Sequence, residues 1–186
     1  HAEREILQAQ PKKIIDFGSG TCGLLIRLLE QLPQATAIGI DLSASACQKA
    51  REIIQDKGLS HRLQVIHAPV ESLIDDPTLL KDVDVIHAGF VFHDLNPTQS
   101  QVLPSLLAAI KAASPRVKLV IADAIPDDAP WEHNAYSLAF TFLHTHFMDR
   151  KFPSEEGWKA LLEQAGFMDV TLSKPGLSGS RLIVGH

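Results

Sequence analysis

Residues 14–23 read Ile-Ile-Asp-Phe-Gly-Ser-Gly-Thr-Cys-Gly, and this stretch decides the fold. A short apolar run, typical of a buried strand, ends in a carboxylate and then in glycines spaced G-x-G-x-x-G. Gly18 permits a tight turn, Gly20 lets the backbone approach a ligand, and Gly23 lets the next helix pack closely on the strand. The stretch predicts a strand, turn and helix that bind a nucleotide. A glycine-rich turn that holds no ligand is the alternative.

Along the whole chain, apolar runs of strand length alternate with segments of helical period, which is typical of a parallel sheet with crossover helices. The predicted strands lie near residues 13–17, 36–40, 62–67, 83–88, 117–123, 169–173 and 181–184. The loop between the last two is too short for a crossover helix, so these strands should be antiparallel. The predicted fold class is α/β: a Rossmann-like, doubly wound sheet of seven strands, mostly parallel with an antiparallel C-terminal strand.

Two helices are expected between the fifth strand and the C-terminal strand pair. The first covers residues 131–148 and is rich in aromatic and histidine side chains. The second begins at Ser154, a favoured capping residue, and ends at Gly166. With the helices between the strands, they complete the covering of a sheet.

The bulk properties of the chain narrow the classes of partner. Its 186 residues fit one domain, residues 1–186, and its net charge of -5 gives no basic patch for nucleic acid. No apolar run approaches the roughly 20 residues that span a bilayer. Cys22 and Cys47 lie in predicted helices, which favours buried free thiols, a reducing compartment and a cytoplasmic protein. We expect a small-molecule partner, and the abrupt ends suggest a domain of a larger multidomain chain.

Two carboxylates identify the nucleotide that the glycine turn should hold. Asp41 ends the second predicted strand about 20 residues after the turn, where an acid accepts hydrogen bonds from ribose hydroxyls. Asp16 stands two residues before Gly18, where it would repel a pyrophosphate and attract an ammonium group. S-adenosylmethionine carries an ammonium and a sulfonium and has no phosphate. The sequence therefore favours S-adenosylmethionine, with S-adenosylhomocysteine as product, over a nicotinamide dinucleotide.

The stretches 15–23, 39–43 and 84–88 together resemble motifs of class I S-adenosylmethionine-dependent methyltransferases, and the resemblance covers almost the whole chain. In that family the glycine loop cradles the methionine part of the cofactor and the acid after the second strand holds its ribose. Many members also have an aspartate near adenine where this chain has Pro69, so recognition there would rely on backbone groups and Val70. The resemblance implies ten cofactor-binding residues: Asp16, Gly18, Ser19, Gly20, Gly23, Asp41, Leu42, Pro69, Val70 and Ala88.

The segments 91–95 and 120–126 resemble small-molecule O-methyltransferases of the caffeate type. That resemblance implies His93 as general base, Asp123 as the acid that orients it, and Glu155 as a second acid near the histidine. This sequence departs from the family in two ways. Leu95 stands where the family has a tryptophan, and the family's N-terminal dimerisation domain is missing from the sequence. An imidazole accepts a hydroxyl proton well at neutral pH. The alternatives are that His93 merely caps a strand end and that Glu155 complements the dipole of a helix.

The late helix carries a stripe of aromatic and imidazole side chains that could line an acceptor pocket or form core. The substrate-binding candidates are Phe92, His133, Tyr136, Phe140 and His144. We expect no bound metal, because the residues show no recognised ligand spacing; a site built from Asp123, His93 and His144 is the alternative.

The predicted activity is methyl transfer from S-adenosylmethionine to a hydroxyl of a small metabolite, or of an acyl chain on a carrier protein. The natural setting would be a natural-product pathway, with the chain as a domain of a polyketide or peptide synthase. The alternatives are carbon or nitrogen methylation, a nicotinamide oxidoreductase, and a docking module without catalytic activity.

Overall fold

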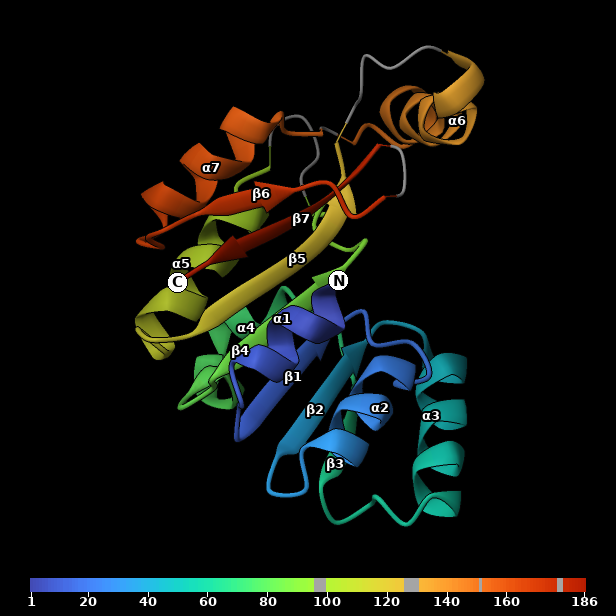
Figure 1. Cartoon of the computed structure of the whole chain (residues 1–186), viewed down its shortest axis with the longest axis vertical. Coiled ribbons are helices and arrows are strands. Elements are labelled where there is room, and N and C mark those ends of the chain that lie inside the picture. The colour runs from blue at the N-terminus through green and yellow to red at the C-terminus, as the bar shows by residue number, and fades with distance from the viewer. Residues whose placement is uncertain (96–99, 126–130, 151, 177–178) are drawn as a thin grey trace.

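The fold is built on one seven-stranded sheet, with the strand order β3-β2-β1-β4-β5-β7-β6 (Figure 1). The computed structural model describes residues 1–95, 100–125, 131–150, 152–176 and 179–186, and for residues 131–137 it describes the helix without the side chains. The strands are β1 (Lys13–Phe17), β2 (Thr36–Asp41), β3 (Leu63–His67), β4 (Val85–Gly89), β5 (Lys118–Ala124), β6 (Thr171–Ser173) and β7 (Ser180–Gly185). Strands β1 to β5 pair in parallel, whereas β7 is antiparallel to both β5 and β6. The predicted fold class is confirmed.

Helices cover both faces of this sheet (Figure 1). They are α1 (Ala2–Gln8), α2 (Gly23–Gln31), α3 (Ala44–Asp56), α4 (Ser72–Asp75), the 3₁₀ turn η1 (Pro77–Leu80), α5 (Val102–Ala113), α6 (Trp131–Phe147) and α7 (Glu155–Gln164). Side chains alternate along each strand, so neighbours such as Ile14 and Ile15 enter different cores. One core lies under α1, α2 and α3, and the other under α4, α5 and α7. Helix α6 lies beyond the carboxyl end of β5 (Figure 1).

Local sequence signals explain how the late elements begin and end. The Ser154 hydroxyl accepts a hydrogen bond from the Gly157 amide at 3.1 Å and caps α7, as predicted. Beyond α7, Gly166 takes a φ of 92°, the left-handed conformation that commonly ends a helix. The expected helix over residues 131–148 ends at Phe147. Among the described residues, no helix combines the length and the apolar character needed to cross a bilayer.

The strand order places the ends of β1 and β4 side by side. Strands β2 and β3 lie on one side of β1, and β4 and β5 lie on the other. The direction in which successive strands are added to the sheet therefore reverses between β1 and β4. Ligands of open α/β sheets bind at such a switch point, beyond the carboxyl ends of the strands. The two loops that leave these ends touch, because a Cβ atom on Gly18 would lie 2.3 Å from Cγ2 of Val91.

Close packing of the glycine loop on the sheet depends on Gly39, not on Gly23 as expected. A Cβ atom built on Gly39, in the middle of β2, would lie 2.6 Å from Oγ of Ser19 and 2.7 Å from Sγ of Cys22. One built on Gly23 would meet only the Arg27 side chain, at 3.8 Å. An isolated glycine inside a strand is the sequence signal for such an approach.

Replacing Gly39 with alanine should therefore lower the free energy of unfolding by about 1–3 kcal/mol, because the new methyl group overlaps two buried side chains. Gly23→Ala is the matched control: it should leave stability unchanged or raise it slightly, because alanine favours the helix and meets open space. Urea denaturation of both variants measures the difference. Equal stabilities would contradict the assigned role of Gly39.

Both cysteines are buried and free, as predicted. Cys47 lies within α3, but Cys22 is the residue before α2 and takes a left-handed φ of 60°, so its predicted helical position is wrong by one residue. Burial raises the pKa of the Cys22 thiol to about 11, although its hydrogen bond to Ser19 opposes this. The thiol is therefore protonated at neutral pH and poorly nucleophilic.

The native protein should accordingly resist alkylation by iodoacetamide at pH 8, with both thiols reacting once urea unfolds the chain. Mass spectrometry of the labelled protein counts the modified cysteines under each condition. Rapid labelling of Cys22 in the folded protein would show that the thiol is accessible, contrary to its burial.

Candidate active site

A cavity of about 330 Å³ opens at the switch point between β1 and β4. Five segments contribute to it: the glycine loop after β1, the end of β2, the loops after β3 and β4, and the segment that follows α6. The lining residues are Gly18, Asp41, Leu42, Ala68, Pro69, Val70, Glu71, Phe90, Val91, Asp94, Leu95, Met148 and Arg150. The cavity therefore lies where the glycine spacing predicts a nucleotide site, and we take it as the candidate cofactor site.

Asp41 holds the two sides of this cavity together. One carboxylate oxygen accepts a hydrogen bond from the Gly20 amide at 2.7 Å, and the other accepts from the Ser43 amide at 2.8 Å. Each oxygen has a second lone pair, which is free to accept from a ribose hydroxyl. A Cβ atom on Gly20 would meet nothing within 4 Å, so a ligand can approach the backbone there. These features fit the ribose and the methionine part of S-adenosylmethionine.

The part of the cavity expected to take adenine is mainly apolar. Leu42, with 71% of its surface exposed, lines it together with Pro69 and Val70, and their contact with adenine stays a prediction. Apolar lining of this kind is suited to the faces of a purine. Five other predicted cofactor residues lie outside the lining: Asp16, Ser19, Gly20, Gly23 and Ala88. Ser19 packs against Cys22, and Ala88 is fully buried in the core.

The charge of the cavity favours a cationic ligand. Among the described lining residues, Asp41, Glu71 and Asp94 stand against one cation, Arg150, which itself pairs with Asp94 at 3.3 Å. Such a surface repels a pyrophosphate and attracts a sulfonium or an ammonium group. Asp16, expected to contact the ammonium, does not line the cavity.

Asp16 lies below the glycine loop instead, in a pair that sequence reasoning missed. It is 4% exposed, and its carboxylate is 2.7 Å from Nδ1 of His87. The two residues are register partners on β1 and β4, so their side chains leave the same face of the sheet. The pairing depends on strand register, which the sequence alone does not give. That Asp16 contacts the ammonium stays a prediction.

His93 and Asp123 form a buried pair beside the cavity. Nδ1 of His93 lies 2.6 Å from one oxygen of Asp123, and the His93 amide donates to the other oxygen at 3.0 Å. The Ala124 amide donates a third hydrogen bond to the carboxylate, at 2.7 Å. Since an ionised carboxylate only accepts, Nδ1 of His93 carries a hydrogen and Nε2 is left with a lone pair. The structure thus brings together the histidine and the acid that the sequence paired.

The surroundings of His93 raise its pKa. Burial by itself would lower the pKa, but the hydrogen bond and the negative charge of Asp123, with a smaller contribution from Asp94, outweigh burial and the opposing charge of Arg150. Phe152 stacks on the imidazole at 5.5 Å, and the Phe140 ring meets it edge-on at 5.3 Å. The imidazole is 2% exposed, so it sits in a dry, aromatic pocket next to the cavity.

The loop that carries His93 begins with an unusual backbone conformation. Phe90 takes a φ of 55°, which costs a non-glycine residue about 1–2 kcal/mol. Its amide donates to the Ala122 carbonyl at 2.7 Å, which holds the turn in place. The turn directs Phe90 into the cavity and Phe92 into the core.

The remaining predicted residues divide into three groups. Phe92 is fully buried against Phe17 and Trp158, so its expected place in the acceptor pocket is wrong and Phe90 faces the cavity instead. Phe140 and His144 do pack against His93. The side chains of His133 and Tyr136 lie outside the described residues.

Glu155 contacts a residue other than His93. Its carboxylate pairs with Arg181 of β7 at 2.5 Å, and none of the described contacts joins it to His93. The second acid near the histidine is Asp94, whose Oδ2 lies 3.8 Å from Nε2 of His93. Its position next to His93 in the sequence was the available signal.

The fold and the site define a nucleotide-binding α/β domain that carries a histidine–aspartate pair at the carboxyl edge of its sheet. The methyltransferase domain family matches residues 15–115, more than half of the chain, and the chain belongs to that family. Two solved structures of similar fold hold the cofactor or its product: human N-acetylserotonin methyltransferase with S-adenosylmethionine and PigF with S-adenosylhomocysteine. The cofactor of this family, S-adenosylmethionine, is the one that the cavity fits.

Individual relatives are similar over most of this chain. Trans-aconitate 2-methyltransferase from Rhodopseudomonas palustris is 28% identical over 90% of the chain, and malonyl-[acyl-carrier protein] O-methyltransferase from Halalkalibacterium halodurans is 30% identical over 74%. The chain covers 54% and 48% of these two proteins, about half of their lengths. The mitomycin 7-O-methyltransferase MmcR matches all of this chain and 52% of its own, with a TM-score of 0.78 and 21% identity. N-acetylserotonin methyltransferase matches 99% of this chain and 51% of its own, with a TM-score of 0.71 and 18% identity.

Asp41→Asn should weaken binding of S-adenosylmethionine about 10- to 100-fold, because an amide lacks the charge and one of the two acceptor oxygens. Isothermal titration calorimetry measures the loss, and thermal unfolding checks that the variant is folded. Glu71→Gln, which removes a charge from the same cavity without touching the glycine loop, should have the smaller effect. Unchanged affinity in Asp41→Asn would place the ribose elsewhere.

Proposed function

We propose that this chain transfers the methyl group of S-adenosylmethionine to a hydroxyl of a small metabolite or of a carrier-bound acyl chain, with His93 as general base. The observation that carries the proposal is the buried His93–Asp123 pair, located beside an acidic nucleotide cavity. Bound S-adenosylmethionine supplies an electrophilic methyl group, and a hydroxyl becomes a good nucleophile only when its proton leaves.

The pair is arranged to accept that proton. Asp123 fixes the hydrogen on Nδ1, so Nε2 of His93 is the basic atom. When Nε2 takes a proton from the acceptor, Asp123 and the nearby Asp94 stabilise the imidazolium. A positioned general base of this kind contributes about 10²- to 10⁴-fold to the rate.

Access to Nε2 requires a side-chain rearrangement. The His93 ring is covered by Phe140, His144 and Phe152, two of which belong to α6. An acceptor hydroxyl therefore reaches Nε2 when one of these side chains moves aside. The same side chains exclude water while the acceptor is bound, which protects the nucleophile from competing hydrogen bonds.

The names of two relatives suggest the acceptor class. One is named for trans-aconitate and the other for a malonyl group attached to an acyl carrier protein, and both of these acceptors carry carboxylate groups. Arg150 lines the cavity near His93, and among the described lining residues it is the cation that an acceptor carboxylate could pair with. A panel of free and carrier-bound hydroxy and keto acids is therefore the first choice of acceptors.

His93→Gln should keep S-adenosylmethionine affinity near that of the wild type and lower turnover about 10²- to 10⁴-fold, because glutamine cannot accept the proton. Asp123→Asn should also lower turnover, since an amide no longer fixes the imidazole tautomer. Radiolabelled S-adenosylmethionine with the acceptor panel measures turnover, and calorimetry measures cofactor binding.

Glu155→Gln is the control for these variants, because it removes a carboxylate that pairs with Arg181 and not with His93. It should reduce thermal stability with little effect on turnover. Wild-type turnover in His93→Gln would refute the base role, and product fragments with the methyl group on carbon or nitrogen would refute hydroxyl transfer. Absence of S-adenosylmethionine binding would leave only a docking module.

A further inference from the structure

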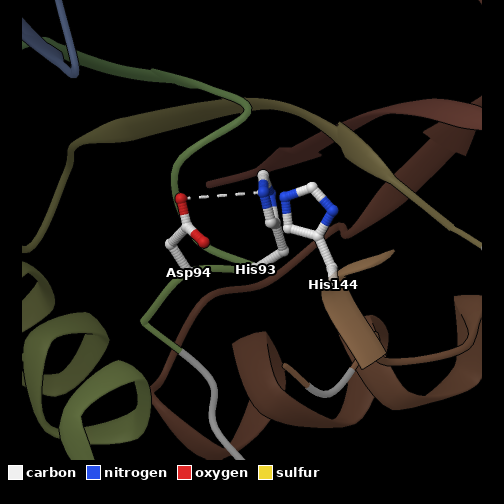
Figure 2. A group of neighbouring side chains, drawn as sticks. All are labelled: His93, Asp94 and His144. Atoms are coloured by element: carbon white, nitrogen blue, oxygen red, sulfur yellow. Dashed lines mark ion pairs between the residues drawn. The ribbon is translucent and has the colours of Figure 1, made fainter. Parts of the chain in front are cut away.

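His93, Asp94 and His144 bring three potential metal-ligand atoms together beside the cavity. One ligand atom from each residue lies within 4.8 Å of the other two, and Figure 2 shows the two imidazoles side by side with Asp94 pointing toward them. The first two residues come from the loop after β4, and the third comes from the last turn of α6. This cluster differs from the one considered from sequence, because Asp123 already accepts three hydrogen bonds and Asp94 takes its place.

The hydrogen bonds around the cluster leave the right atoms free for a metal ion. Nδ1 of His93 donates to Asp123, and Nδ1 of His144 donates to the Phe140 carbonyl at 2.8 Å. Each neutral imidazole therefore has its lone pair on Nε2. Metal-binding histidines in proteins almost always donate their other nitrogen to a carboxylate or a carbonyl in this way. Both kinds of outer partner are present here.

The third ligand is held in a similar way. Oδ1 of Asp94 pairs with Arg150 at 3.3 Å, which leaves Oδ2 toward His93, 3.8 Å from Nε2. Ligand atoms around tetrahedral zinc are about 3.4 Å apart, so a small movement of these side chains brings them to bonding distance. Asp94 is 45% exposed and lines the cavity, which gives an ion a path to the buried imidazole.

We propose that His93, Asp94 and His144 form a binding site for a divalent transition-metal ion such as Zn²⁺ or Co²⁺, with Nε2 of both histidines and Oδ2 of Asp94 as ligands. Two imidazoles and one carboxylate suit these ions and do not suit Mg²⁺ or Ca²⁺, which prefer oxygen ligands.

Metal binding has a consequence for methyl transfer, and only this consequence rests on the proposed function. Nε2 of His93 has one lone pair, which can bind a metal ion or accept a proton but cannot do both at once. The ion therefore excludes the base role, and turnover falls as the site fills. A transition-metal ion bound at this site would therefore inhibit methyl transfer.

Binding is tested by adding Co²⁺ to the chelator-treated chain and recording its visible d–d absorption, which reports tetrahedral nitrogen and oxygen ligation. The wild type should give a saturable spectrum with one ion per chain. Loss of a residue that supports a metal ligand typically weakens metal binding about 10- to 100-fold. His144→Ala and Asp94→Asn remove a ligand itself, so each should weaken Co²⁺ binding by at least that much. Thermal unfolding confirms that each variant is folded, and two variants on different elements guard against the failure of one.

His146→Ala is the matched control, because it removes an imidazole from the same helix two residues away. The Nδ1 atom of His146 bonds the Phe142 carbonyl at 3.2 Å, but the residue is exposed and lies outside the cluster. It should bind Co²⁺ as the wild type does. No saturable spectrum in the wild type, or equal binding in the wild type and in His144→Ala, would overturn the proposed site.

The effect on turnover is measured separately, by adding Zn²⁺ to the wild type and then EDTA. We expect Zn²⁺ to inhibit methyl transfer at the concentrations that displace Co²⁺, and EDTA to restore it. Activity that disappears with EDTA would overturn the inhibitory role. Because the cobalt spectrum needs no acceptor, the binding result holds or fails independently of whether the proposed methyl transfer is found.

Discussion

The candidate active site depends on one hydrogen bond, from Nδ1 of His93 to the carboxylate of Asp123. It lies where the Asp123 side chain has no exposed surface, so water does not compete with it. Hydrogen bonds to a charged group contribute about 1.5–3 kcal/mol, and an unpaired carboxylate at this depth would cost more than that. The bond joins the loop after β4 to β5 and fixes the imidazole tautomer. The base and the proposed metal ligand are therefore the same nitrogen atom.

The charges of the cavity act as a group, and no single carboxylate decides the ligand. Asp41 ends β2, and Glu71 and Asp94 follow β3 and β4, yet the parallel sheet brings all three to one edge. From the sequence, we expect the negative charge of Asp16 to attract a cationic cofactor and repel a pyrophosphate. In the structure, the three carboxylates of the cavity supply that negative charge together. Asp16 itself pairs with His87 one layer below, where it supports the loop from inside the sheet.

The sequence could predict those parts of the site that follow from strand ends. His93 and Asp123 each come at or just after the carboxyl end of a strand, and β4 and β5 are neighbours, so the two residues had to meet. Asp41 followed from the same rule. The contacts of His144 and Glu155 could not be predicted, because they depend on where α6 and α7 dock. Arg181, the partner of Glu155, lies far along the chain on β7. The position of its side chain depends on the register with which β7 pairs antiparallel to β5.

The contact between the glycine loop and Val91 bears on how this family can change over time. Position 18 has no room for a side chain while a branched residue stands at position 91, and its φ of 65° already disfavours one. Position 91 in turn lies two residues before His93. A substitution in the glycine loop that binds the methyl donor is thus coupled to one in the loop that carries His93. We expect positions 18 and 91 to covary among homologous sequences.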